Sequence, residues 1–187
     1  MLLMLAAAAS ALAAPARSRA PSPALCGGSL WRMKTLSDPA RRSVALAPKT
    51  TTIGAIGRRP FPRPVPTKRR TAFQRQAWEV VAQVTLYRLE DAGLRLVLFD
   101  DGAYVNAVIP TPGCLTKTSR ARTEITDAWN TFLTKCTKPT HDWQTLGAIV
   151  YVRGIGLWSA RRGDRGAAPN GAELYPVTGF RIVAGCR

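Results

Sequence analysis

Acidic residues and histidine are scarce in this sequence of 187 residues. Aspartate and glutamate number 11 against 27 lysines and arginines, and with the one histidine counted as neutral the formal net charge is +16. A metal site built on two imidazoles lacks its second histidine, and serine–histidine or cysteine–histidine catalysis would have to use His141. We therefore expect no catalytic residue, no cofactor and no metal site. An enzyme that pairs His141 with Asp142 is the alternative.

Motifs that bind nucleotides or zinc are absent as well. The glycines of GIGLWS, residues 154–159, lack the strand-to-helix context of a phosphate-binding loop. The four cysteines contain no CxxC pair, which favours disulfides in an exported protein over zinc or thioredoxin-like chemistry. Asp91, Asp100 and Asp101 lie at predicted turns, where aspartate side chains bind neighbouring amides.

Long apolar runs are missing except at the start of the chain. Residues 2–14, LLMLAAAASALAA, have the length and the small residues of a signal peptide, so 1–14 is predicted to be a signal-peptide-like segment of a secreted or periplasmic protein. The run is short for a membrane span, which needs about 20 apolar residues. No basic residue precedes it and no acid occurs before Asp38, so an organellar presequence or a cytoplasmic chain with a mis-assigned start is the alternative.

The remaining composition is that of a globular protein. Hydrophobic residues make up 46% of the chain and charged residues 20%, which excludes wholesale disorder, collagen, a coiled coil and a multi-span membrane protein. The length fits one domain with tails. The excess of positive charge favours an acidic partner, such as nucleic acid or another acidic polymer, and no protein partner is indicated.

Positive charge is concentrated before residue 71. The first 70 residues contain 13 basic residues and 1 acid, whereas the rest contain 14 and 10. The stretch 58–70, RRPFPRPVPTKRR, combines this charge with proline. We expect residues 15–75 to form a flexible, basic, proline-rich arm that builds no core. Such an arm is either a tether for an acidic partner or a solvated segment that keeps a domain soluble.

Strand patterns begin near residue 76. WEVVAQVTLYRLE alternates apolar and polar residues, and turns separate it from LRLVLF and from AYVNAVIP, in which Val105, Ala107 and Ile109 share one face. These patterns predict three consecutive strands. Apolar residues at helical spacing over 119–136 predict a helix with Ser119 as its N-cap. Two further strands follow, GAIVYVRGIGLW with a bulge at Gly154 and Gly156, and ELYPVTGFRIV, in which Pro176 leaves out one ladder hydrogen bond.

This order of elements predicts the fold. Three strands, a helix and two strands follow the order of the OB-fold, so residues 76–187 are expected to form a mainly β, five-stranded OB-like small barrel with one helix between strands three and four. An α+β sandwich of the same elements is the alternative. A helix of about 25 Å separates Cys114 from Cys136 and would strain a bridge between them. In an OB-like barrel the end of the fifth strand lies beside the start of the fourth and the end of the third, so Cys186 can meet Cys136 or Cys114, and we favour Cys136. Cys26 pairs with the cysteine left over or stays free.

Several motifs resemble a group of exported bacterial proteins of unknown activity. LEDAGLRLVL, AVIPTPGC and VYVRGIGLWSARRGDRGAAPNGAELYPV occur here in the order of that group, and the similarity covers about residues 44–187. Its specific part is a C-terminal G-APNG-ELHPV signature. The matching residues, which the resemblance implies to be structural, are Pro169, Asn170, Gly171, Glu173 and Pro176.

Four positions depart from the pattern of that group. It usually has histidine where this chain has Arg95, Arg162 and Tyr175, and aspartate where it has Ser159. Each exchange removes a potential metal ligand or acid–base group. The resemblance therefore implies a binding module without enzymatic activity, or a degenerate hydrolase-like or metal-binding member that has lost its histidines.

A basic loop carries the predicted binding site. The loop RRGDRG, residues 161–166, joins the last two predicted strands, where OB-folds often bind ligands, and neighbouring aromatic residues offer faces on which bases stack. The alternative is a structural or protein-interaction domain whose basic loop is merely solvated. The predicted polyanion-binding residues are Arg153, Trp158, Arg161, Arg162, Arg165 and Tyr175.

Overall fold

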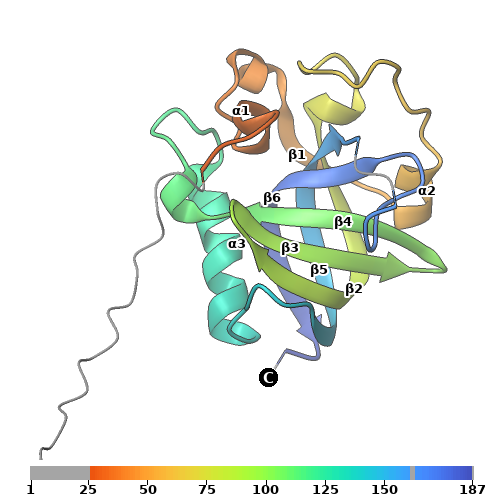
Figure 1. Cartoon of the computed structure of the whole chain (residues 1–187), viewed down its shortest axis with the longest axis vertical. Helices are drawn as coiled ribbons and strands as arrows, with labels where there is room; N and C mark the ends of the chain where they lie inside the picture. The colour runs from red at the N-terminus through yellow and green to blue at the C-terminus, as the bar shows by residue number, and fades with distance from the viewer. Residues whose placement is uncertain (1–25, 161–162, 187) are drawn as a thin grey trace, which may run out of the picture.

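The part of the chain that the structure describes contains six strands, and five of them close into a ring (Figure 1). The computed structural model describes residues 26–160 and 163–186. Strands pair in the order β2-β3-β4-β6-β5, and β5 pairs back onto β2. All these pairs are antiparallel except β4–β6, which is parallel. The mainly β class and the five predicted strands are confirmed as β2 (Gln76–Glu90), β3 (Gly93–Asp100), β4 (Ala103–Pro110), β5 (Gln144–Trp158) and β6 (Ala172–Ala184).

The bulge predicted in the fourth strand of that series is present in β5. The register between β5 and β6 shifts between Arg153 and Gly154 and again between Gly154 and Gly156. A Cβ atom on Gly156 would collide with the backbone oxygen of Phe73, so a side chain has no room there. Pro176 lies opposite this irregular stretch, where the β6 ladder is interrupted. The ring therefore tolerates a proline in a strand that has neighbours on both sides.

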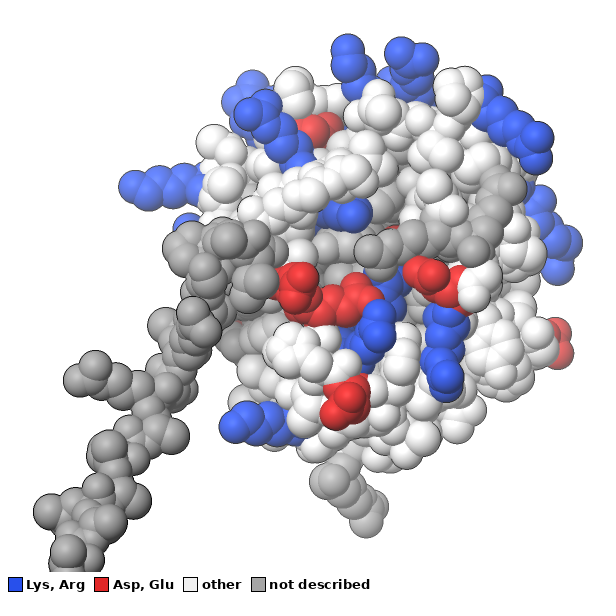
Figure 2. Space-filling view, viewed as in Figure 1, with Lys and Arg blue, Asp and Glu red and all other residues white. Residues whose placement is uncertain are grey.

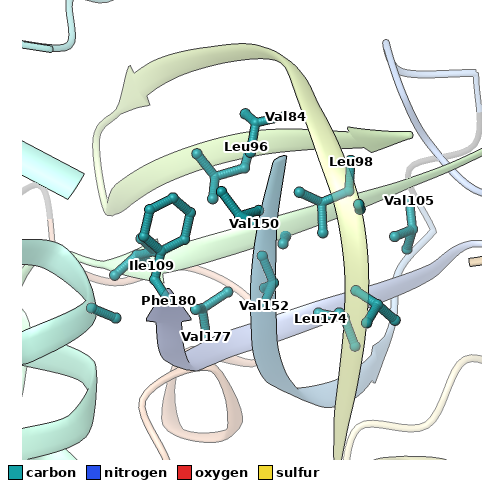
Figure 3. Close-up of a cluster of buried hydrophobic side chains, with 14 of the residues drawn as sticks. Val84, Leu96, Leu98, Val105, Ile109, Val150, Val152, Leu174, Val177 and Phe180 are labelled. Atoms are coloured by element: carbon teal, nitrogen blue, oxygen red, sulfur yellow. The ribbon is translucent and has the colours of Figure 1, made fainter. Parts of the chain in front are cut away.

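Alternate residues of the ring point inward and form the main core. Figure 3 shows side chains from every ring strand meeting there, among them Leu96, Val105 and Val152. Helix α3 (Arg122–Lys135) covers one end of the ring, and its Phe132 ring lies 5.7 Å from that of Phe180. The predicted N-cap is wrong, because the helix begins at Arg122. The Ser119 hydroxyl instead accepts a hydrogen bond from the Thr116 amide at 3.1 Å.

Two disulfides bind the outer elements together. Cys136, at the end of α3, pairs with Cys186 just after β6, as predicted. Cys26 pairs with Cys114, which lies in the short helix η4 (Pro112–Cys114) after β4. Such bonds form and persist in oxidising compartments.

Residues 26–75, called the N-terminal segment below, are ordered rather than flexible. Strand β1 pairs in parallel with the start of β2. Leu36 and Val44 pack on Ala77 and Ile155, on the outside of the ring. The flexible arm predicted for 15–75 is therefore wrong for 26–75, while residues 1–25, with the signal-peptide-like run, lie outside the described residues. The segment contains α1 (Trp31–Lys34), η2 (Pro39–Ser43), β1 (Ala45–Thr50), α2 (Ile53–Gly57) and η3 (Phe73–Arg75).

Buried polar side chains explain why this segment is ordered. The side chain of Arg69 is fully buried and donates to Asp38 Oδ1 at 3.1 Å, to Met33 O at 2.7 Å and to Gln74 O at 2.9 Å. Burial lowers the pKa of Arg69, and the charge of Asp38 opposes that effect. A single guanidinium thus satisfies carbonyl groups from two short helical turns that have no strand to pair with.

Distant residues hold the rest of the segment. Arg120 Nη1 donates to three carbonyl oxygens at the end of η2, including that of Val44 at 2.7 Å. Asn170 Nδ2 donates to the carbonyl oxygens of Ile56 at 2.8 Å and Arg59 at 2.9 Å. No helix among the described residues has the length and apolar character needed to cross a membrane.

Candidate functional site

The net charge of the described residues comes from the N-terminal segment. Residues 26–75 contain twelve lysines and arginines and one acid, Asp38, which is paired with Arg69. Residues 76–160 and 163–186 contain ten basic and ten acidic residues. Figure 2 shows lysine and arginine side chains along the upper and right edges of the molecule. The exposed cations of the segment, called the cationic surface below, are Arg32, Arg42, Lys49, Arg58, Arg63, Lys68, Arg70 and Arg75.

Four of these cations project from the proline-rich stretch 58–70, which is fixed on the ring. The ring of Phe61 lies edge-on to Trp158 with centroids 5.9 Å apart, and Pro66 is buried. Within the described residues, the side-chain charges of the exposed Arg58, Arg63, Lys68 and Arg70 form no ion pair and no hydrogen bond. Their charges are therefore presented to solvent from an ordered backbone.

The two aromatic residues predicted to stack on bases are buried. Trp158 is 2% exposed, and its indole N–H donates to Thr71 Oγ1 at 3.0 Å. Tyr175 is 4% exposed and packs with Met33 of α1. The prediction of stacking faces at these positions is wrong, because Trp158 belongs to the main core and Tyr175 is covered by the N-terminal segment.

The predicted arginines do not come together in one site. Arg153 lies on the outer face of β5, where Nη2 is 3.3 Å from Glu79 Oε2 of β2. Arg165 is exposed, and its guanidinium lies 5.8 Å from the centre of the Trp143 ring. Arg161 and Arg162 lie outside the described residues.

The residues of the APNG-ELxPV stretch have structural contacts. Besides the two bonds donated by its amide, Asn170 accepts a hydrogen bond from the Ala172 amide. Gly171 has a φ of +70°, and a Cβ atom there would collide with Ser159 O, which only glycine avoids. Pro169 lies next to Gly57 of α2. These contacts agree with the structural role expected for the stretch, whereas Glu173 is part of a charged cleft.

That cleft opens beside the β2–β3 turn and has a volume of about 830 Å³. It is called the charged cleft below. Its walls come from β2, β3, β5, β6 and the N-terminal segment, and they contain both signs of charge. The charged residues that line it are Lys34, Arg88, Glu90, Asp91, Arg95 and Glu173.

Glu90 is the centre of the ion pairs in the cleft. Its Oε1 lies 2.8 Å from Arg88 Nη2 and 2.8 Å from Arg95 Nε, and Arg95 Nη1 is 3.9 Å from Glu173 Oε1. Burial alone raises the pKa of Glu90, but the hydrogen bonds and charges of Arg95 and Arg88 outweigh it and hold that pKa below its ordinary value. Burial lowers the pKa of Arg95, but interactions with Glu90, Glu173 and Tyr175 outweigh burial. The pKa of Arg95 is therefore above its ordinary value. These groups are therefore ionised at neutral pH.

Sequence reasoning missed this cleft, although one signal was present. Asp91 and Ala92 form the turn of the β2–β3 hairpin, and Glu90 therefore pairs with Gly93. In this antiparallel register Arg88 lies directly opposite Arg95. Like charges in that position repel, so a carboxylate must lie beside them. Glu90 fills that position two residues after Arg88. The contributions of Lys34 and Glu173 come from distant parts of the chain and carry no local signal.

The cleft presents charged side chains to a ligand. No group of three or more histidine, cysteine, aspartate or glutamate side chains suited to a metal ion occurs in the part of the chain that the structure describes. His141 and Asp91 line the cleft and are exposed. Ionised side chains of both signs around a cavity favour a polar or charged ligand.

Comparisons with known proteins add a structural likeness. No family model and no curated protein matches the chain. A crystal structure assigned as an aspartyl-tRNA synthetase from Leishmania major Friedlin is similar with a TM-score of 0.46 and 14% sequence identity. The match covers 76% of this chain and 22% of the synthetase chain.

Proposed function

We propose that the protein is an exported, non-enzymatic binding module with an OB-like fold that holds a polyanion on its cationic surface. The observation that carries this proposal is the separation of charge: the ordered N-terminal segment has eight exposed cations and no exposed acid, whereas the remaining described residues are neutral. Cations on an ordered backbone bind phosphate groups without the cost of ordering a chain.

The arrangement of strands supports the OB-like part of the proposal. The five ring strands occur in the order of a Greek key, with one parallel pair between β4 and β6 and with α3 between the third and fourth of them. Two disulfides support an oxidising environment and hence export.

The residues of the charged cleft support a role without catalysis. Arg95, Ser159 and Tyr175 all line the cleft. These are three of the positions at which the chain departs from the bacterial group that it resembles, and at each a potential ligand or acid–base group is replaced. We infer that this chain uses the region for binding and not for chemistry on histidines.

Fluorescence anisotropy with labelled single-stranded DNA tests the cationic surface. The oxidised full-length chain is titrated over a series of salt concentrations and compared with the quadruple variant Arg58→Gln, Arg63→Gln, Lys68→Gln and Arg70→Gln. Each phosphate contact contributes about 0.7 to the slope of log affinity against log salt for single strands. The variant is expected to bind more weakly and to lose about 3 from this slope if all four residues contact phosphates.

A matched control removes the same charge from the remaining part of the chain. Lys117→Gln, Arg122→Gln, Lys135→Gln and Lys138→Gln change four exposed cations outside the N-terminal segment. This variant is expected to retain most of the affinity and of the salt slope. Equal losses in both variants would show that net charge acts alone and would contradict the proposed surface. A parent chain that binds neither single-stranded DNA nor a sulfated polysaccharide at low salt would overturn the polyanion proposal.

A further inference from the structure

The charged cleft differs from the cationic surface in its balance of charge. Three cationic side chains line it, and so do three carboxylates, those of Glu90, Asp91 and Glu173. Because the two signs balance, a polyanion would gain no net electrostatic attraction from the cleft. A small molecule with groups of both signs would find an opposite charge for each.

The two arginines of the β2–β3 hairpin have hydrogen-bonding capacity left for an anionic group. A guanidinium has five N–H donors. Within the described residues, the side chains of Arg88 and Arg95 each donate one hydrogen bond, in both cases to Glu90. Arg95 Nη1 and Arg88 Nε are buried without an acceptor, and the side chain of Arg88 is 35% exposed. A ligand carboxylate beside this pair supplies acceptors that the described residues do not.

A carboxylate at the β2–β3 turn is available for the opposite charge. Asp91 is exposed and lines the same cleft. Its side chain has no hydrogen bond or ion pair with any described residue. A ligand ammonium group that reaches Asp91 gains a charge-assisted hydrogen bond without breaking an existing ion pair.

Paired strands and buried aromatic residues form the walls of the cleft. The β2–β3 hairpin is a continuous ladder from Leu86 to Glu90, and the aromatic residues Trp158 and Tyr175 form a buried wall. The volume of about 830 Å³ lies in the range of small-molecule sites, which is about 300–1,000 Å³.

We propose that the charged cleft binds a small zwitterion, with the ligand carboxylate on Arg88 and Arg95 and the ligand ammonium on Asp91. This site is separate from the cationic surface, and its existence does not depend on polyanion binding. The ligand class is an amino-carboxylate that carries one group of each sign.

Amide chemical-shift titrations of the oxidised full-length chain test this proposal. The probes are ε-aminocaproate, caproate and hexylamine, which present both charged groups or one of them on the same carbon chain. We expect ε-aminocaproate to shift resonances of the β2–β3 hairpin and to bind at least about tenfold more tightly than either single-charge probe. Equal affinity for caproate and ε-aminocaproate, or no shift in the hairpin with any probe, would overturn the proposal.

Two substitutions locate each end of the probe. Asp91→Asn is expected to weaken ε-aminocaproate about tenfold and to leave caproate unchanged, whereas Arg88→Gln is expected to weaken both. Asp101→Asn, at the exposed β3–β4 turn, is the control and should change neither. Asp91→Asn breaks no hydrogen bond or ion pair among the described residues, so we expect it to leave the fold intact. It therefore tests the ammonium position even if Arg88→Gln disturbs the hairpin. Unchanged binding of ε-aminocaproate to Asp91→Asn would contradict the zwitterion site.

Discussion

The N-terminal segment and the ring of strands are stabilised in different ways. In the ring, backbone groups pair with the neighbouring strand in ladders that run from β2 round to β5 and back. In the N-terminal segment, one short strand pairs with the ring, and many carbonyl groups are bound by the side chains of Arg69, Arg120 and Asn170. Side chains thus replace the ladder for carbonyl groups that lie outside the one strand of the segment.

This difference shows what decides whether a proline-rich basic stretch is ordered. Composition describes the stretch alone, whereas order depends on partners elsewhere in the chain. The partner of Arg59 is Asn170, 111 residues away, and that of Val44 is Arg120, 76 residues away. The segment is part of the folded domain because the ring supplies these partners.

Removal of the whole segment should have the largest effect. A chain that starts at residue 76, with Cys114→Ser to avoid an unpaired thiol, loses the buried Leu36, Val44, Ile53, Ile56 and Phe73. At about 1.5–3 kcal/mol for each side chain, the loss is about 10 kcal/mol, comparable to the total stability of a domain. We expect no cooperative urea transition by circular dichroism. A cooperative transition at the midpoint of a chain that starts at residue 26 would show that the segment is an appendage.

Substitution of Arg69 should remove a large part of that stabilisation. Arg69→Met leaves the carboxylate of Asp38 buried without its counter-charge, and it leaves the carbonyl groups of Met33 and Gln74 without this donor. Loss of one partner of a buried ion pair costs about 3–5 kcal/mol. Urea unfolding at neutral pH measures the change. The neighbouring exposed residue gives the control, because Arg70→Met is expected to stay within about 0.5 kcal/mol of the parent; similar effects for both would contradict the proposed role of Arg69.

The ion pairs of Glu90 should contribute less to the free energy of unfolding than Arg69 does, and their contribution should depend on pH. Arg95 and Arg88 hold the pKa of Glu90 below its ordinary value of 4.5. The stabilisation from the ionised carboxylate is therefore complete above that value and is lost as the pH falls through the lowered pKa. Glu90→Gln is expected to cost about 1.5–3 kcal/mol at neutral pH, and the difference from the parent should shrink in acid. A difference that stays constant from neutral to acid pH would contradict the assigned ion pairs.

The ring could be predicted from the sequence because its signals are local. Alternation predicts a strand that buries Val80, Val84 and Leu86, and Val80 and Val84 do point into the core. A register shift between Val84 and Leu86 then brings Tyr87 into the core in place of Leu86. The paired glycines of β5 predicted the bulge, and the neighbours of the last strand in the expected barrel led to the Cys136–Cys186 disulfide. Each inference needs neighbouring residues and standard geometry.

The segment and the site could not be predicted in this way. Met33 and Leu36 belong to two different clusters on the outer side of the ring, and most of their partners there come from distant strands. The predicted site was wrong for the same reason, because contacts with distant parts of the chain bury its aromatic residues. Leu157 and Trp158 are consecutive residues of β5, so their side chains point to opposite faces of the strand. Trp158 belongs to the main core, and the N-terminal segment covers Leu157 on the other face. An aromatic residue in a strand is available for stacking when its outer face is bare.

The two disulfides have a consequence for the connectivity of the molecule. One bond encloses residues 26–114 and the other residues 136–186, so the covalent loops follow each other without overlapping. The only covalent link between them is the stretch that contains α3. A single protease cut in α3 would therefore release two separately cross-linked fragments, each with ring strands that lack a partner. The β2–β5 and β4–β6 pairings would then have to hold the fragments together as a noncovalent complex, so the chain is suited to reconstitution from two complementary pieces.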